Sequence, residues 1–297
     1  EAGSTELLAW LSACTKYNGL VLADVPNAQQ SPRVFERSLI AQLGADSGAT
    51  SVGYNLRSLR QAAGNVRERL SQEQRNLIER LDDEFAAQHL SLSADADYAS
   101  QEALEALEEA SELLSAITGA QTDRMMRDDG WRMLSVGRHI ERLGTLSQAL
   151  AMALDTGCAF DDGGYEAVLA LFDSTITFHA HYQQRRDLVA LLDMLVTHRD
   201  NPRSLAWVLS TLRARVGKLP DAHGLPAHSL LEQVPDPAGW DLIALSGALA
   251  GPAGQQNSYL GLLELLQACE RGAYDLSDRL GHAYFSHADR VNRSILS

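Results

Sequence analysis

The residue types best suited to chemistry lie together in one run, Gly130-Trp-Arg-Met-Leu-Ser-Val-Gly-Arg-His-Ile-Glu-Arg142. At about 100° per residue, a helix through this run places Trp131, Arg138 and Arg142 on one side, with Glu141 beside them. Two guanidiniums could hold a carboxylate or a phosphate, and a neighbouring glutamate could act as a general acid or base. The run therefore suggests a polar site in which Glu141 is the candidate catalytic residue.

The same spacing has a plainer interpretation, because the three charged residues of the run also suit ion pairs on the surface of a helix. Trp131 favours the buried alternative, since a helix with an apolar stripe on one side and a large aromatic residue on the other should be covered on both sides. Charges between two covered faces must be paired, because an unpaired buried charge is costly. We therefore expect the three charged side chains to face inward, with Arg203 or His198 as their neighbours from elsewhere in the chain.

A second group of polar residues surrounds the expected start of a later helix. Pro202 suits the first position of that helix, and Asn201 suits its N-cap. A helix N-terminus attracts anions, so the charges around it could form an anion site, whereas a turn with a capping residue and solvated charges is the plainer alternative. The candidate binding residues of the whole chain are Trp131, Arg138, Glu141, Arg142, His198, Arg199, Asp200 and Arg203.

The central helix that carries the run should span about 128–155. Asp128 or Asp129 can cap its start, and no proline interrupts the stretch from 131 to 153. Small residues recur on this helix at a spacing of seven, and a second helix should cross closely at the first of them, Gly137. Those small residues are Gly137, Gly144 and Ala151, and the apolar stripe beside them is Met133, Val136, Ile140, Leu143 and Ser147.

The rest of the chain also favours helices. No period-two alternation longer than four residues appears outside the loops, so we predict an all-α fold: a single large helical bundle of about ten or more helices, one domain over residues 1–297. In the helix expected at 161–184, His179 falls on an apolar stripe with Phe172 and Ile176, which predicts a buried, hydrogen-bonded histidine. The other expected helices lie at about 5–15, 34–43, 50–66, 71–89, 100–118, 187–196, from 202 onward, 227–233, 237–250, 254–282 and 284–295.

Two segments of the chain resemble each other without a gap. Ser204-Leu-Ala-Trp-Val-Leu-Ser-Thr-Leu-Arg213 lies over Ser51-Val-Gly-Tyr-Asn-Leu-Arg-Ser-Leu-Arg60, so that Trp207 lies over Tyr54. We interpret this as a repeat of two halves, about 1–118 and 119–297. Each half needs an apolar partner, so the two should pack into one bundle about a pseudo-twofold axis rather than form independent domains. On this alignment the first half lacks its opening helix.

Composition excludes several classes of function. The net charge is −14 and lysines and arginines form no run, so binding to nucleic acid or to an anionic membrane is not expected. No apolar run approaches the ~18 residues that span a bilayer. Three widely spaced cysteines fit reduced thiols and a cytoplasmic location. Glu-x-x-His pairs and glycine-rich phosphate loops do not occur, so we expect neither a metal site nor a nucleotide site in this chain.

Three motifs occur in order along the chain: the run 130–142, Phe172-Asp-Ser-Thr-Ile-Thr-Phe178 and Arg199-Asp-Asn-Pro-Arg-Ser-Leu205. Together they resemble the alpha-E family, a bacterial all-helical domain named for a Glu-Arg motif, and Val52 to Leu70 fits the family's first-half segment. The family usually opens with a Gly-Arg-x-x-Glu-Arg helix, which is absent here, and it tends to be arginine-rich where this chain has His179-Ala-His181-Tyr. The resemblance implies an association, by gene neighbourhood or fusion, with circularly permuted ATP-grasp amide ligases, transglutaminase-like proteases and a proteasome-like peptidase.

Two hypotheses of different class follow. In the first, the chain is a non-catalytic helical module that docks to, or is fused with, an ATP-grasp ligase and positions its peptide-like or amino-acid substrate. ATP and magnesium would then bind only to the ligase. In the second, the chain is a hydrolase or transferase that uses Glu141 as acid or base, with Arg138, Arg142 and Arg203 holding the substrate. A buried Glu141 that lines a cavity with arginines would favour the enzyme, and an exposed Glu141 would favour the module.

Overall fold

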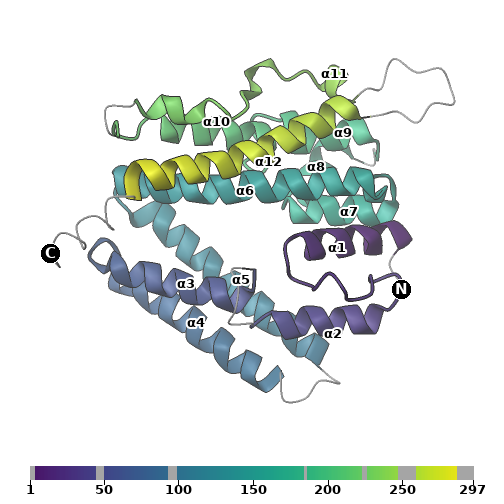
Figure 1. Cartoon of the computed structure of the whole chain (residues 1–297), viewed down its shortest axis with the longest axis horizontal. Helices are drawn as coiled ribbons and strands as arrows, with labels where there is room; N and C mark the ends of the chain where they lie inside the picture. Colours follow the sequence, from purple (N-terminus) through teal and green to yellow (C-terminus); the bar gives the residue numbers. More distant parts are fainter. Residues whose placement is uncertain are drawn as a thin grey trace. The chain divides into compact units, whose positions relative to one another are not determined.

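A computed structural model of the chain (Figure 1) describes residues 4–44, 50–92, 99–183, 186–222, 226–246 and 259–285. Every regular element in these ranges is a helix, which confirms the predicted all-α class. The chain divides into two compact units, one formed by Glu1–Trp10 together with Arg127–Ser297, and the other by Leu11–Met126.

The smaller unit, Leu11–Met126, has its own hydrophobic core. Leu56, Leu81 and Phe85 lie at the centre of this core and are at most 6% exposed. The predicted boundary between two halves, at 118/119, falls inside the last helix of this unit. The elements of the unit are α1 (Thr5–Tyr17, which begins in the larger unit), α2 (Pro32–Gln42), α3 (Val52–Asn65), η1 (Arg67–Arg69), α4 (Gln72–Leu92) and α5 (Ala99–Arg124).

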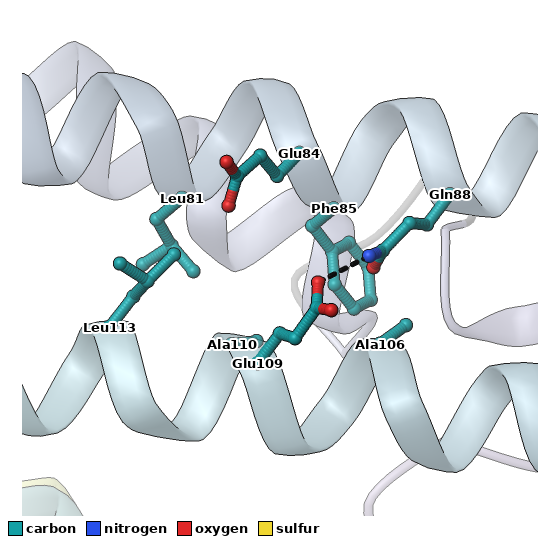
Figure 2. A pocket seen from close by; sticks show the side chains of 8 residues that line it. All are labelled: Leu81, Glu84, Phe85, Gln88, Ala106, Glu109, Ala110 and Leu113. Atoms are coloured by element: carbon teal, nitrogen blue, oxygen red, sulfur yellow. Dashed lines mark hydrogen bonds between the residues drawn. The ribbon is translucent and has the colours of Figure 1, made fainter.

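The two long helices α4 and α5 pack against each other along their apolar faces. Figure 2 shows Leu81 opposite Leu113, with Phe85 between the two helices. Farther along, the Gln88 amide donates a hydrogen bond to the Glu109 carboxylate. Residue numbers rise on α4 as they fall on α5, so the pair is antiparallel, and side chains fill the space between the helices.

The local sequence explains where the helices of the smaller unit begin. The Ser51 hydroxyl accepts a hydrogen bond of 2.9 Å from the backbone N–H of Tyr54 and caps α3. At α4, the Ser71 hydroxyl accepts from the Gln74 N–H at 3.2 Å, and the Gln74 side-chain oxygen accepts from the Ser71 N–H at 2.9 Å. This reciprocal pair is a capping box, and the start of α4 agrees with the predicted start.

The larger unit is arranged around α6, along which α12 and α10 pack (Figure 1). Residues 284 and 285 are the only described part of the helix expected at 284–295. Of the helix expected at 237–250, residues 237–246 are described, and they form a 3-10 turn (Pro237–Gly239) and a short helix (Leu242–Ser246) separated by an extended Trp240, so the prediction of one continuous helix is wrong there. The elements of this unit are α6 (Asp129–Asp155), η2 (Cys158–Phe160), α7 (Asp162–Leu171), α8 (Thr175–Tyr182), α9 (Leu188–Leu192), the π-helix η3 (Asp193–Thr197), α10 (Leu205–Val216), η4 (Ala227–Leu231), η5 (Pro237–Gly239), α11 (Leu242–Ser246), α12 (Leu260–Leu280) and the π-helix η6 (Gly281–Phe285).

The predicted central helix is present, with the bounds that the sequence suggested. The Asp128 carboxylate accepts a hydrogen bond of 3.0 Å from the Trp131 N–H and caps α6. From the predicted apolar stripe, Val136, Ile140 and Leu143 are buried. An aspartate cap also suits the helix dipole, which favours negative charge at the N-terminus.

The close helix crossing lies at a different glycine from the predicted one. Gly137 is exposed, and a Cβ added there would meet nothing within 4 Å, so the prediction of a crossing at Gly137 is wrong. The crossing is one heptad later: a Cβ on Gly144 would lie 3.6 Å from the Tyr274 ring and 3.8 Å from Ala273 Cβ, both on α12. A spacing of seven identified the row of small residues but could not say which member meets α12.

The helix expected at 161–184 is broken in two. α7 ends at Leu171 and α8 begins at Thr175, and between them Asp173 has a left-handed backbone with φ of 49°. The break changes the faces of the second part, so Ile176 is 87% exposed. His179 is also exposed and its Nε2 lies 3.2 Å from a Glu166 carboxylate oxygen. The prediction of a buried His179 is therefore wrong.

Helix α10 starts later than predicted. Its N-cap is Ser204, whose hydroxyl accepts a hydrogen bond of 3.1 Å from the Trp207 N–H. Asn201 does not cap the helix, because its side-chain amide turns inward and donates to the Ser174 hydroxyl at 3.1 Å and to the Met194 carbonyl at 3.0 Å. A buried asparagine with these partners fixes the turn before α10 to the break between α7 and α8.

The two segments of the predicted repeat begin in the same way but continue differently. Ser51 and Ser204 are equivalent N-caps, and each accepts from the N–H of an aromatic residue three positions later. After α3 the chain enters η1 and the long helix α4, whereas α10 is followed by a turn and the short helix η4. The repeat stays a prediction.

Candidate functional site

The predicted site face of α6 packs against α10, and three contacts join the two helices. Trp131 contacts Arg215 near the end of α10, His139 contacts Trp207, and Arg142 lies near Arg203, just before α10. Residue numbers rise on α6 as they fall on α10, so the pair is antiparallel. We call this contact the cationic seam; it consists of Arg127, Trp131, Arg138, His139, Arg142, Arg203, Trp207 and Arg215.

At one end of the seam, Trp131 lies between two guanidiniums. The guanidinium carbon of Arg127 lies 4.2 Å from the ring centroid and that of Arg215 lies 4.4 Å from it, and Trp131 is only 7% exposed. Each contact is a cation–π interaction, worth about 0.5–2 kcal/mol depending on solvation. Burial and the positive charges of Arg127 and Arg132 lower the pKa of Arg215. Within the described residues the Arg215 Nε is buried without a hydrogen-bond partner.

The middle of the seam holds a buried histidine that sequence inspection did not single out. His139 is 7% exposed, and its Nδ1 lies 2.6 Å from the Ser135 carbonyl oxygen, one turn back on α6. This distance identifies Nδ1 as the protonated nitrogen, which donates to the carbonyl. The other nitrogen, Nε2, is buried without a partner among the described residues, and the ring centroid lies 5.7 Å from that of Trp207.

The other end of the seam is a cluster of guanidiniums with one carboxylate. Burial, and then the charges of Arg203 and Arg138, lower the pKa of Arg142 to about 10, while Asp173 opposes the shift. The Asp173 carboxylate pairs with Arg203 at 3.1 Å. Burial also lowers the pKa of Arg138. Arg142 has no hydrogen bond or ion pair with any described residue, and the Asp173 carboxylate, which pairs with Arg203, reaches Arg142 through its charge.

The structure separates Glu141 from the arginines of its motif. Arg138 and Arg142 are half-buried, as expected for the face that packs on α10, and Arg203 is the expected neighbour of Arg142. Glu141 is exposed and forms no ion pair with a described residue. The expectation that all three charges face inward is therefore wrong for Glu141, which lies just outside the covered face.

The second predicted cluster is a turn whose polar groups bond mainly to one another. The His198 carbonyl accepts from the Ser204 hydroxyl, and His198 Nδ1 accepts from the Asp200 N–H at 3.2 Å. Arg199 reaches the Ala238 carbonyl at 3.5 Å. Of the residues predicted for this cluster, Arg203 joins the cationic seam, and the structure does not bring His198, Arg199 and Asp200 into it.

Sequence reasoning missed five residues of the site for identifiable reasons. His139 lies in the predicted motif, but its burial depends on the contact with α10. Arg127 and Arg215 have no motif of their own, and Asp173 reaches the cluster only because the helix breaks there. For Trp207 the available signal was its alignment with Tyr54 in the predicted repeat.

The described residues contain no group of three or more His, Cys, Asp or Glu side chains that could hold a metal ion. In the same part of the chain, no helix combines the length and the apolar character needed to cross a membrane. The three cysteines, Cys14, Cys158 and Cys269, are free thiols.

These observations define a helical domain with a buried arginine-rich helix contact. The chain belongs to the Alpha-E family, described as a predicted alpha-helical domain with a conserved ER motif, whose model matches residues 2–285. Uncharacterised proteins of Mycobacterium bovis and Mycobacterium tuberculosis are each 29% identical to it over 110 residues. The match covers 36% of this chain and 12% of each relative, so the chain spans a small part of their length. No solved structure matches the chain.

Proposed function

We propose that this chain is a non-catalytic helical module of an ATP-grasp-type amide ligase system, and that its cationic seam binds an anionic group of a peptide-like substrate or of the ligase. The observation that carries the proposal is Arg142, a half-buried guanidinium that lies close to those of Arg138 and Arg203 and forms no ion pair with a described residue, while Asp173 pairs with Arg203. It stands out in a chain whose net charge is −14.

The physical argument concerns the cost of this cluster to the free protein. Half-buried guanidiniums that repel one another are less stable than solvated ones, and the lowered pKa of Arg142 reflects that cost. A carboxylate or phosphate at the cluster would supply the missing counter-charge and could accept two parallel hydrogen bonds from one guanidinium. His139 Nε2 and Arg215 Nε, which have no hydrogen-bond partner in the described part of the chain, offer further polar contacts along the seam.

The position of Glu141 favours a module over an enzyme. A general acid or base must lie within hydrogen-bond reach of the group it serves. Glu141 is exposed, whereas the arginines that would hold a substrate are on the covered face. In the proposed arrangement ATP and magnesium bind to the ligase, and this chain supplies only recognition.

We further propose a cytoplasmic location. Its support is the set of three free thiols, Cys14, Cys158 and Cys269, of which the last two are buried. Burial raises the pKa of Cys14 to about 11 and that of Cys269 to about 12, so both stay protonated and unreactive at neutral pH.

The seam can be tested by calorimetric titration with an N-acetylated tripeptide that has a free C-terminal carboxylate, and with the same peptide as its C-terminal amide. The wild-type chain should prefer the carboxylate form by about tenfold or more, which is the effect expected for a charge-assisted hydrogen bond. Arg142→Gln should abolish the preference. Arg271→Gln, which removes the same charge from an exposed position on α12, should retain it.

A second measurement tests the link to a ligase. ADP release by a purified ATP-grasp ligase encoded beside this chain should rise on addition of the wild-type chain, and less so with Arg142→Gln. Equal stimulation by the wild-type chain and by Arg142→Gln would show that the seam plays no part in the effect on the ligase. Turnover of a peptide by the chain alone, lost in Glu141→Gln, would instead establish the enzyme hypothesis.

A further inference from the structure

The smaller unit contains a second polar site, at the corner where α3 ends and α4 begins. A groove of about 270 Å³ opens there. Its floor is apolar and comes from Ala63 on α3 and Ile78 on α4, which are both buried. Its walls are polar and consist of Arg60, Arg67, Gln72, Arg75 and Glu79.

The three guanidiniums of the groove differ in their ion pairs and hydrogen bonds. Arg60 pairs with Asp82 at 3.0 Å and with Asp83 at 2.6 Å, so its charge is already balanced. Arg75 donates to the Gln72 amide oxygen at 2.5 Å, but its Nε is buried without a partner among the described residues. The Arg67 side chain is exposed and bonds to none of them. Two positive groups in the groove therefore lack a counter-charge.

One negative group in the groove also lacks a partner. Glu79 lies one helical turn after Arg75 on α4, yet within the described residues its carboxylate forms neither an ion pair nor a hydrogen bond. A ligand complementary to the groove therefore carries two negative groups, one positive group and a short apolar body for the floor. A simple phosphate or dicarboxylate would satisfy Arg67 and Arg75 but would be repelled by Glu79.

We propose that this groove binds an acidic amino acid, free or at the end of a peptide. Its two carboxylates pair with Arg67 and Arg75, its ammonium pairs with Glu79, and its methylene groups lie on Ala63 and Ile78. The site is in a different unit from the cationic seam and does not depend on the function proposed for it.

The test is calorimetric titration of the full chain with L-glutamate, and with glutarate, which has both carboxylates but no ammonium. L-Glutamate should bind at least about tenfold more tightly than glutarate, since an ion pair to the ammonium is lost. Arg75→Met and Arg67→Gln should each weaken glutamate binding by a similar factor. Arg33→Gln, an exposed charge change on α2 in the same unit, should leave it unchanged.

Glu79→Gln decides whether the ligand is an amino acid or a simple anion, because the two hypotheses predict changes of opposite sign in binding affinity. For an acidic amino acid the variant should lose affinity and no longer prefer glutamate over glutarate. For a simple anion it should bind glutarate or inorganic phosphate more tightly than wild type does, and that result would overturn the proposal.

A variant that fills the groove guards against effects of misfolding. A Cβ on Gly64 would meet nothing within 4 Å, so Gly64→Leu should fold and place its side chain in the groove. It should abolish glutamate binding while the melting temperature stays at or above that of wild type. A stable Gly64→Leu variant that still binds glutamate would exclude this groove as the site.

Discussion

At Arg142, burial and two neighbouring guanidiniums act on the same group, and both lower its pKa. Such a residue destabilises the free protein, and a bound anion would offset this destabilisation. Binding sites commonly lower stability in this way for the sake of function. We predict that Arg142→Met, which keeps the alkyl part of the side chain, raises the free energy of unfolding by about 0.5–2 kcal/mol. Urea denaturation at neutral pH measures this.

The matched control for Arg142→Met is Arg271→Met, at an exposed site on α12, which should change stability little. Sulfate, a divalent oxyanion, should stabilise the wild type and the Arg271 variant alike, but not the Arg142 variant. A loss of stability in Arg142→Met would mean that the arginine is a structural residue and would remove the main support for an anion site at the seam.

His139 gives a prediction about pH. Burial and the charges of Arg142, Arg138 and Arg215 lower its pKa below the ordinary histidine value of about 6.5, and the bond to Ser135 only partly opposes this. Because the unfolded state then binds more protons than the folded state, His139 destabilises the fold as the pH falls below about 6.5. His139→Gln should therefore flatten the decline in stability between roughly pH 7 and pH 5, measured by urea denaturation.

The control for this titration is His228→Gln, because His228 is exposed. Its stability should follow the wild-type curve across the same pH range. If His139→Gln also follows that curve, protonation of His139 does not contribute to acid sensitivity.

At the scale of elements, α12 is held by contacts that leave no room for a side chain on one of its glycines. A Cβ on Gly272 would lie 2.7 Å from the Gln233 carbonyl oxygen and 3.2 Å from Pro235 Cδ. We predict that Gly272→Ala destabilises the protein by about 1–3 kcal/mol, because backbone atoms would have to move. Gly137→Ala should instead stabilise it by up to about 1 kcal/mol, since only the helix propensity changes. Thermal unfolding of the two variants would contradict this account if both shifted the midpoint in the same direction.

The caps of the helices could be predicted from sequence, and their breaks could not. Asp128 and Ser71 cap α6 and α4 as expected, because capping depends on residues within one turn. The break at Asp173 depends on distant partners. The Asn201 amide donates a hydrogen bond to the Ser174 hydroxyl, and Arg203 pairs with Asp173. The turn before α10 therefore contacts the break between α7 and α8 directly. Periodicity through Phe172 and Ile176 cannot register such contacts.

The candidate site could likewise be predicted only in the part that depends on local sequence. The face of α6 that bears Arg138 and Arg142 was identified from spacing, because spacing fixes which residues share a face. The partner residues Trp207 and Arg215 required knowledge of how α6 packs on α10. Glu141 is exposed because α10 covers the face of α6 that bears Arg138 and Arg142 and not Glu141, and the sequence alone does not show where that cover ends.

At the scale of the whole molecule, sequence predicted one bundle over 1–297, and the structure has two compact units, each with buried aliphatic residues of its own. Leu81 lies in the core of the smaller unit and is 1% exposed, and Leu150 on α6 is fully buried in the larger one. Replacing either leucine with alanine should cost about 2–5 kcal/mol, the range for a buried leucine that leaves a cavity. The two variants are matched in chemistry and differ only in which core they damage.

Hydrogen exchange followed by mass spectrometry locates that damage along the chain. If each unit unfolds around its own core, Leu81→Ala should speed exchange mainly in α3, α4 and α5, and Leu150→Ala mainly in α6, α10 and α12. Equal acceleration in all these helices by both variants would mean that the two cores unfold together, as the prediction of a single bundle requires.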